Sequence, residues 1–184
     1  MTLDEKIQQY VQKLPLSFQE ELLDFVEYLL IKAEQQEKQD WTSLSLSSAM
    51  RDMEDESASY NLSDIRIAFS WNNGQIVVFR FPQTDLEQGK LRSALLLRKL
   101  PGEYDDWLIC MISSQTRQYI TGFDEIVQED DDDFGASGLK VTSVIRVGRL
   151  AVVSGEILIG AIGQVSSERL SRVKKHLSDW LSGE

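Results

Sequence analysis

The first forty residues place apolar side chains three or four positions apart, the spacing of amphipathic helices. Thr2-Leu3-Asp4-Glu5 is a capping box that opens a helix expected to end near Leu14, before Pro15. Ser17-Phe18-Gln19-Glu20 is a second capping box, opening a longer helix expected to reach about Gln39. Two helices alone make a thin core, so the broad apolar stripe of the second needs a partner. We expect that partner to be another copy of the hairpin or the rest of the chain.

From residue 39 to residue 63 the chain is rich in Ser, Asp and Glu, with apolar side chains scattered among them. The apolar positions are Trp41, Leu44, Leu46, Met50, Met53, Tyr60 and Leu62. Sparse apolar anchors on an acidic string are typical of a segment that becomes ordered against a partner surface. The alternative is a surface linker with one short helix near Ser47–Met53, a role that has little use for a Trp, a Tyr and two Met.

Beyond residue 64 the hydrophobic period changes from helical to two. Two alternating runs, 65–71 and 75–81, flank Asn72-Asn73-Gly74, which predicts a β-hairpin. Further strands are predicted near 93–98, 107–113, 141–147 and 150–153, with a tight turn at Gly148-Arg149 between the last two. We therefore expect an α+β chain: a helical and wrapping region over residues 1–70, then a small barrel over residues 71–184.

A helix starting near Ser166 is expected to close the chain. Its apolar positions predict that it buries Leu170, Val173, Leu177 and Leu181. Its basic residues are expected on the solvent side; they are Arg169, Arg172, Lys174 and Lys175. His176, the single histidine, is expected on the surface of this helix.

Charge is unevenly distributed along the chain. Residues 1–70 carry a formal charge of −8 and residues 71–184 carry −3, which together give the −11 of the whole chain. Such an acidic chain is a poor free binder of nucleic acid, and DNA is an improbable partner because residues 1–40 hold only four lysines. The asymmetry suits an acidic front half that occupies a phosphate-binding surface on the back half. The acidic run 129–133 lacks the ligand spacing of a calcium loop, so a solvated loop is expected there.

Several kinds of chemistry have no support in the sequence. It contains no CxxC, HExxH, P-loop or dinucleotide motif, and we expect neither a metal nor another cofactor. The single Cys110 lies in an apolar run and is expected to be a buried thiol in a reducing compartment. The acidic N-terminus does not resemble a signal peptide, and no apolar run reaches the ~18 residues of a membrane span. The expected location is the cytoplasm, without membrane contact.

Two strand ends carry the candidate chemistry. Arg92 begins a strand directly after a Gly-containing loop with Glu87 and Gln88, and Ser113 ends another strand. A guanidinium and a hydroxyl can together hold a phosphate, and RNA supplies its own nucleophile as the 2′-OH. Such a site could cleave RNA without a metal, with Glu87 as the available general base. The alternative for Arg92 is a surface salt bridge to Asp85 or Glu87.

These residues lie in motifs that resemble the MazF/PemK-type toxins. The resemblance begins with Gly74-Gln75-Ile76-Val77 and Gly89-Lys90-Leu91-Arg92. It continues through Ile112-Ser113-Ser114-Gln115 and Ser143-Val144-Ile145-Arg146-Val147, and into the closing helix, so that it covers nearly all of residues 72–184.

The resemblance implies an SH3-like barrel that dimerises and cleaves single-stranded RNA without metal, leaving a 2′,3′-cyclic phosphate. It implies catalytic roles for Arg92, Ser113 and Glu87, and we expect Gln88, Lys90 and Gln115 to bind RNA. Two positions depart from the family pattern: Ser93 replaces the usual Pro, and Ser113 replaces the usual Thr. Serine keeps the hydroxyl but lacks the methyl group that fixes the threonine rotamer.

The N-terminal motifs are Leu14-Pro15, Leu23-Asp24-Phe25-Val26-Glu27-Tyr28-Leu29-Leu30, Trp41, Leu46-Ser47 and Leu62-Ser63-Asp64-Ile65. With them residues 1–67 resemble a separate family of antitoxins, so the chain resembles a toxin and an antitoxin fused. The hypothesis is a latent endoribonuclease that its own acidic N-terminal region inhibits and that proteolysis between residues 39 and 60 activates. The expected inhibitory residues are Trp41, Met50, Asp52, Met53, Glu54, Asp55 and Glu56. The alternative is a catalytically inactive oligomeric module with a regulatory or DNA-binding role. Both predict a homodimer or higher homo-oligomer. The expected antitoxin–toxin contacts lie either between copies or within one chain.

Overall fold

The computed structural model describes residues 2–53, 60–66, 70–81 and 90–183. The chain divides into two compact units, residues 1–41 and residues 42–184. The boundary therefore falls inside a helix, and residues 42–53 and 60–66 belong to the same unit as the sheet. The domain boundary expected after residue 70 was based on the sequence resemblance, and it differs from this division of the structure after residue 41.

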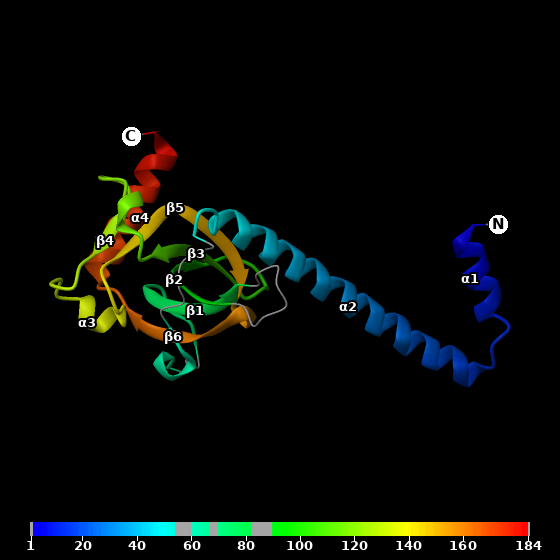
Figure 1. Ribbon diagram of the computed structural model, residues 1–184. Coiled ribbons are helices and arrows are strands. Elements are labelled where there is room, and N and C mark those ends of the chain that lie inside the picture. Colours follow the sequence, from blue (N-terminus) through cyan, green and yellow to red (C-terminus); the bar gives the residue numbers. More distant parts are fainter. Residues whose placement is uncertain (1, 54–59, 67–69, 82–89, 184) are drawn as a thin grey trace. The chain divides into compact units, whose positions relative to one another are not determined.

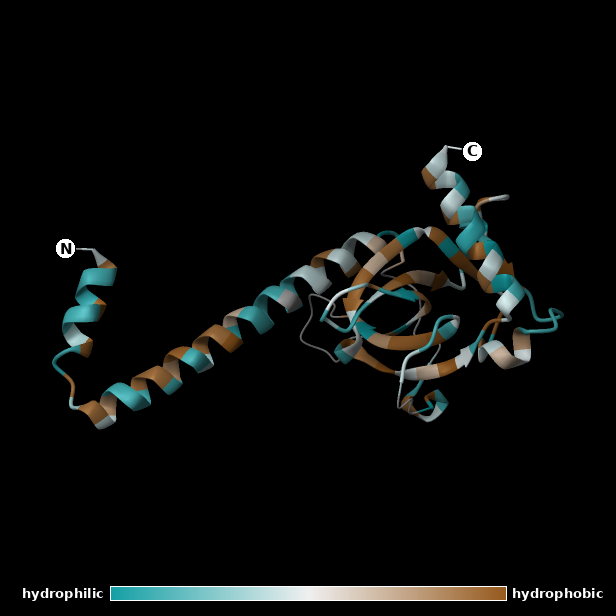
Figure 2. Cartoon of the chain, turned by 180° about the vertical axis from the view of Figure 1, so that it is seen from behind, coloured by the Kyte–Doolittle hydropathy of each residue, from teal (hydrophilic) through white to brown (hydrophobic). Residues whose placement is uncertain are grey.

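The first unit is helical, as its spacing predicts. Helix α1 spans Leu3–Val11, and Thr2 and Glu5 form the predicted capping box at its start. Helix α2 spans Leu16–Ala49 and contributes its first part to this unit. Most of the apolar side chains of the unit are exposed, including those of Ile7, Phe25 and Leu29. Figure 2 shows apolar and polar residues alternating along both helices.

Helix α2 continues ten residues beyond its predicted end at Gln39. Residues 40–49 contain no Gly or Pro that would stop a helix. Within the second unit, Leu46, Ala49 and Met50 recur at helical spacing and are buried against the sheet. This tertiary contact accounts for a helix that the serine-rich sequence alone does not predict.

The second unit is built on one six-stranded antiparallel sheet in the order β4-β5-β3-β2-β1-β6 (Figure 1). The strands are β1 Gln75–Phe81, β2 Lys90–Lys99, β3 Asp106–Ser113, β4 Glu125–Val127, β5 Ser143–Ser154 and β6 Leu158–Gln164. Helices α3, Phe134–Ser137, and α4, Ser167–Ser182, complete the unit. Among the residues that the structure describes, the edge strands β4 and β6 do not pair with each other. The closed SH3-like barrel is therefore not confirmed, although the α+β class is.

Two details of the strand prediction are wrong. The predicted hairpin with β1 does not form, because β2 and β6 take both edges of that strand; residues 67–69 of the predicted partner lie outside the described residues. Instead Arg66 forms an isolated bridge with Ala161 of β6. Gly148-Arg149 is not a turn either, since β5 runs through it as one strand with a shift in its register against β3. A bulge absorbs the extra residues without ending the strand.

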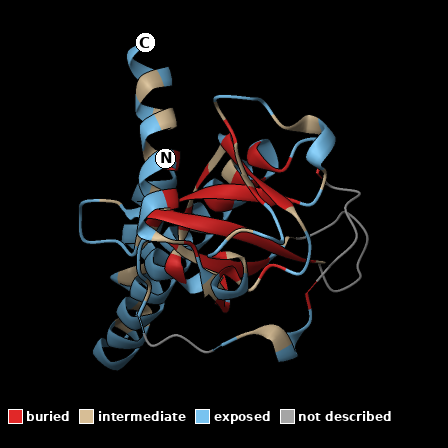
Figure 3. Ribbon diagram, turned by 90° about the vertical axis from the view of Figure 1, so that its left-hand side faces the viewer, coloured by how far each residue is buried: buried red, intermediate tan, exposed pale blue. Residues whose placement is uncertain are grey.

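Both faces of the sheet are apolar and both are covered, so that the strands are buried in Figure 3. The face that we call the strap face carries Val77, Phe79, Ala94, Leu96, Trp107, Ile109, Met111, Ala151, Val153, Leu158 and Ala161. The opposite face, which we call the helix face, carries Ile76, Val78, Leu91, Leu95, Leu97, Cys110, Ile112, Val127, Ile145, Val147 and Ile162. Helix α4 covers the helix face through Val173, and partly buried Leu170 and Leu177 pack there too.

Residues 42–53, which we call the strap, cover the strap face. Leu46, Ala49, Met50 and Met53 are buried in the same cluster as the sheet side chains. The strap also closes part of the open edge of β5, because the Val152 N–H donates to Ser45 Oγ at 2.9 Å. The strap therefore forms one side of the hydrophobic core, as expected for a segment ordered by the surface that it contacts.

The acidic run 129–133 is only partly the solvated loop that the sequence suggested, because Glu129, Asp130 and Asp132 are exposed whereas Asp131 and Asp133 contact α4. Arg169 is buried and not exposed as predicted, and its guanidinium contacts Asp133, Asp131 and Glu125. It also donates to the carbonyl oxygen of Ile126 at 2.6 Å. At the far end of the helix Leu181 is exposed, contrary to prediction. One arginine therefore fixes α4 to three carboxylates.

Replacing Arg169 by Ala should lower the free energy of unfolding by about 3–5 kcal/mol, because it leaves buried carboxylates unpaired. Arg172→Ala is the matched control: Arg172 pairs with Glu125 from an exposed position, and its replacement should cost about 0–1 kcal/mol.

Arg169 also holds the pKa of Asp133 below its usual range. This carboxylate therefore stabilises the fold above its unfolded pKa, and its contribution is lost as the pH falls below about 4. Urea unfolding across pH should show a shallower acid loss in Asp133→Asn; an unchanged profile would contradict the assignment.

Candidate active site

Arg92 and Ser113 lie on the same face of the sheet. Arg92 pairs with Phe79 across β1 and β2, and paired residues of antiparallel strands project to the same side. Ser113 follows Met111 by two positions on β3, and so projects to the side of Met111. Phe79 and Met111 both belong to the strap face. The guanidinium and the hydroxyl that the sequence singled out therefore share the face that the strap covers.

The register of β2 and β3 also brings the two residues to the same end of the sheet. Ala94 pairs with Met111, and Arg92 and Ser113 each lie two residues beyond this pair in the same direction along the sheet. One phosphate lying over this end of the sheet could contact both groups.

Both groups are buried in the intact chain. The side chain of Arg92 is 6% exposed and that of Ser113 is 1% exposed. Ser113 Oγ accepts a hydrogen bond from the Gln115 N–H at 3.0 Å, which fixes the start of the loop after β3. Both side chains are therefore shielded from solvent.

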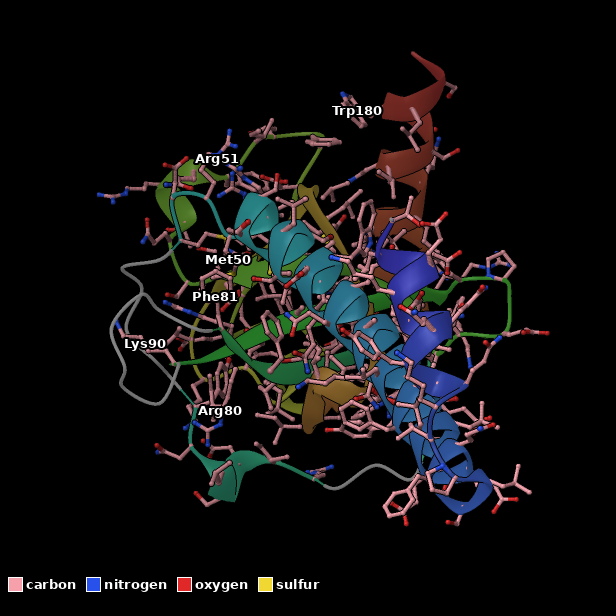
Figure 4. All side chains as sticks on the ribbon, turned by 90° about the vertical axis from the view of Figure 1, so that its right-hand side faces the viewer. Met50, Arg51, Arg80, Phe81, Lys90 and Trp180 are labelled. Carbon is pink, nitrogen blue, oxygen red and sulfur yellow. The ribbon has the colours of Figure 1, made fainter. Side chains whose placement is uncertain are left out.

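The predicted RNA-binding residues are placed as follows. Lys90 begins β2 opposite Phe81 and is half-buried (Figure 4). It precedes Arg92 by two positions on β2 and so projects to the same face. Gln115 is half-buried beside Ser113, and its Oε1 accepts from Arg117 at 3.3 Å. Glu87 and Gln88 lie outside the described residues.

The predicted inhibitory residues divide into three groups. Met50 and Met53 are buried on the strap face, and Figure 4 shows Met50 on the same side of the sheet as Phe81. Asp52 is exposed and contacts Arg149 Nη2 at 3.4 Å. Trp41 belongs to the first unit and is 63% exposed. Glu54, Asp55 and Glu56 lie outside the described residues.

A buried polar group beside β3 was missed by the sequence analysis. Arg146 of β5 contacts Asp124 at 3.2 Å and donates to Gln118 Oε1 at 2.7 Å. Asp124 in turn accepts from the N–H groups of Ile120 and Val147. This network anchors the loop that leaves the strand ending at Ser113. A lone arginine inside the apolar run 143–147 was the available signal, since a buried cation needs a partner.

Ser93, which stands where the family pattern has Pro, projects to the helix face. Its hydroxyl is hydrogen-bonded to the hydroxyl of Tyr60, and burial of Tyr60 raises the pKa of this phenol. Lys140 lies over the Tyr60 ring and forms an ion pair with Asp64 at 2.6 Å. The departure at position 93 thus serves a contact with the N-terminal half of the chain, on the side of the sheet away from Arg92.

The remaining titratable candidates do not join this site. Cys110 projects to the helix face, and burial raises the pKa of its thiol far above the usual range. His176 lies on α4, where its Nδ1 is 2.9 Å from the carbonyl oxygen of Phe123. Among the described residues no cluster of His, Cys, Asp and Glu could hold a metal ion. No helix in the same part of the chain is long and apolar enough to span a membrane.

Comparison with known proteins gives this arrangement a family. A family model described as a PemK-like, MazF-like toxin of type II toxin–antitoxin systems matches residues 72–181. A comparison with curated proteins found no match.

Three solved structures illustrate the likeness. One is MazF from Deinococcus radiodurans, with 21% identity, 62% of this chain and 99% of that chain covered, and a TM-score of 0.45. A second is the toxin MazF-mt6 from Mycobacterium tuberculosis, with 14% identity, 59% and 96% covered, and a TM-score of 0.44. The third is an endoribonuclease in complex with its cognate antitoxin from a mycobacterial species, with 13% identity, 61% and 96% covered, and a TM-score of 0.43.

The sheet with its strand-end Arg and Ser, closed by α4, is the part of the chain that carries the match. Since the family model spans more than half of the chain, this protein belongs to the PemK-like, MazF-like toxins of type II toxin–antitoxin systems. The match begins at residue 72 and leaves α1, α2 and the strap outside it.

The burial of Cys110 predicts a chemically inert thiol. In the folded chain the thiol should react with a soluble disulfide reagent at pH 8 at least about a hundredfold more slowly than in the urea-unfolded chain, because only the accessible thiolate attacks. Absorbance of the released reagent measures the rate. Equal rates in the two states would show that Cys110 is accessible.

Proposed function

We propose that this protein is a latent endoribonuclease, a toxin and an antitoxin in one chain, which cleaves single-stranded RNA once the strap leaves the sheet. The single observation that supports this is the shared face: Leu46, Ala49, Met50 and Met53 pack on the side of the sheet to which Arg92 and Ser113 project. The proposed cleavage site and its proposed cover therefore share one face of the sheet.

The proposed chemistry is a metal-independent transesterification. The 2′-oxygen attacks the adjacent phosphorus, the bond to the 5′-oxygen breaks, and the products are a 2′,3′-cyclic phosphate and a 5′-hydroxyl end. Arg92 would bind two phosphate oxygens with its planar donors and stabilise the charge of the pentavalent transition state. Ser113 would donate to a further oxygen. Glu87 is the proposed base for the 2′-OH proton, and the departing 5′-oxygen takes up a proton. Gln88, Lys90 and Gln115 are the proposed RNA contacts around this centre.

Inhibition would act through occupancy and charge together. Because the strap belongs to the same chain, its local concentration at the sheet is high and a free antitoxin would not be needed. The −8 charge of residues 1–70 would repel RNA as long as the strap stays in place. Activation would require proteolysis between residues 39 and 60, after which the strap could dissociate.

The experiment compares RNA cleavage by four full-length chains. The Met50→Ala/Met53→Ala chain loses two buried side chains of the strap, each worth about 2–5 kcal/mol of packing, and should cleave a mixed single-stranded RNA at least about tenfold faster than the parent. The same chain with Arg92→Ala should fall back to background. Leu44→Ala/Leu62→Ala is the matched control, because both leucines are exposed and the chain should stay latent.

Cleavage products resolved on a denaturing gel decide the outcome. Absence of Arg92-dependent cleavage in the weakened chain would remove the enzyme from the proposal. In that case a salt-sensitive shift of operator DNA by the intact protein would favour the alternative, a catalytically inactive regulatory module.

The exposed apolar side chains of the first unit support a proposal of self-association through the helical hairpin. Phe25 and Leu29 lie four residues apart on α2 and are both about half exposed, a spacing suited to a helix–helix seam with a second copy. Replacing both by Asp should reduce the mass of the particle in light scattering to that of one chain. Asp24→Ala/Glu27→Ala, on the same turns, is the control and should leave the mass unchanged. A parent protein that is already monomeric would contradict the proposal.

A further inference from the structure

Arg149 is a second cation beside the strap. It lies in the bulge of β5, between Ile145 and Val147 on the helix face and Ala151 and Val153 on the strap face, and its ion pair with Asp52 sets its side chain on the strap side. Its side chain is 26% exposed, so it stands at the rim of that side and not in the core. Neither the family resemblance nor the proposed chemistry assigns it a role.

A carboxylate of the strap forms an ion pair with Arg149. Asp52, which lies between the buried Met50 and Met53 in the sequence, has its Oδ2 3.4 Å from Arg149 Nη2. Asp52 has a φ of +67°, and it is the one non-glycine residue with positive φ in the part of the chain that the structure describes. Glycine would form this left-handed turn without strain, whereas the backbone here carries a charged side chain and points it at a guanidinium.

This ion pair contributes little to holding the strap in place. The side chain of Asp52 is 64% exposed, and exposed ion pairs are worth little because water and salt screen them. The buried contacts of Leu46, Ala49, Met50 and Met53 hold the strap instead. What the pair does change is the state of Arg149: while Asp52 is present, the guanidinium already has an anionic oxygen in front of it.

We propose that Arg149 is a phosphate-binding residue for the RNA strand and that Asp52 takes the place of that phosphate in the closed chain. The inference rests on the proposed function, since it assigns a second backbone contact on the face where Arg92 would hold the scissile phosphate. Arg149 suits this role because guanidinium groups bind phosphate oxygens in pairs and stay charged. Each such contact also releases condensed counterions, which makes the affinity depend on salt.

The test measures binding of a fluorescein-labelled single-stranded RNA whose 2′-hydroxyls are methylated, so that it cannot be cleaved. Fluorescence anisotropy gives the affinity of the full-length Met50→Ala/Met53→Ala chain at several salt concentrations. Adding Arg149→Ala should weaken binding about tenfold and reduce the slope of log affinity against log salt by about 0.7, the loss of one phosphate contact on a single strand. Arg149→Lys should keep most of the slope. Arg98→Ala is the matched control, since Arg98 is an exposed arginine at the far end of β2 from Arg92 and should change neither quantity.

The closed chain supplies an independent arm. Asp52→Asn removes the charge and keeps a residue that tolerates positive φ, so it should raise the RNA affinity of the otherwise unaltered chain about threefold. Asp52→Asn combined with Arg149→Ala should lose that gain.

The outcomes separate this inference from the proposed function. If the weakened chain binds the methylated RNA and cleaves unmethylated RNA, but Arg149→Ala leaves affinity and salt slope unchanged, Arg149 is not a phosphate contact and the inference is overturned alone. If the weakened chain neither binds nor cleaves, the proposed function fails and takes this inference with it. Thermal unfolding of each variant checks that a loss of RNA affinity does not come from a loss of the fold. If Arg149→Ala is unfolded, the RNA affinity and salt slope of Arg149→Lys are used instead.

Discussion

The sheet of the second unit is apolar on both sides, and each side must be covered. Helix α4 meets this requirement on one side with Val173, and the strap meets it on the other with Met50 and Met53. Burying these side chains contributes on the order of 2 kcal/mol each, so neither cover is dispensable in water. This requirement ties the N-terminal half to the toxin-like half, whatever the catalytic competence of the site beneath.

Strand alternation then decides what each cover conceals. Arg92 and Ser113 occupy positions whose neighbours two residues away are core side chains of the strap face, and both are buried. Ser93, one position from Arg92, faces the other way and contacts Tyr60. Residues N-terminal to the sheet therefore pack on both of its faces, the strap on one and Tyr60 on the other. Stability and latency would depend on the same contacts, and a change that loosens one would loosen the other.

Much of this arrangement could be predicted from local pattern. The capping box at Thr2 located the start of α1, and alternation located β1, β2 and β3, because these signals depend on neighbouring residues alone. The second predicted box did not form, because α2 already begins at Leu16, before Ser17. The same-face placement of Arg92 and Ser113 follows from strand period once the register is known, yet the register itself depends on long-range pairing. The failures have the same origin. Asn73-Gly74 is a good hairpin turn, but β6, some eighty residues later, takes the edge that a hairpin would need. Arg169 looked like a surface cation because its carboxylate partners lie in a distant loop.

The edge of β5 adds a last consequence. Along Leu150–Ser154 this strand pairs with β3 on one side, while on the other Ser45 satisfies the backbone N–H of Val152. In the proposed active state, without the strap, a hydrophobic surface and an unpaired strand edge would be exposed together, and this combination favours association with other chains. The toxin-like part released in this way would be prone to aggregation, and its lifetime would depend on how soon another chain pairs with the exposed edge of β5.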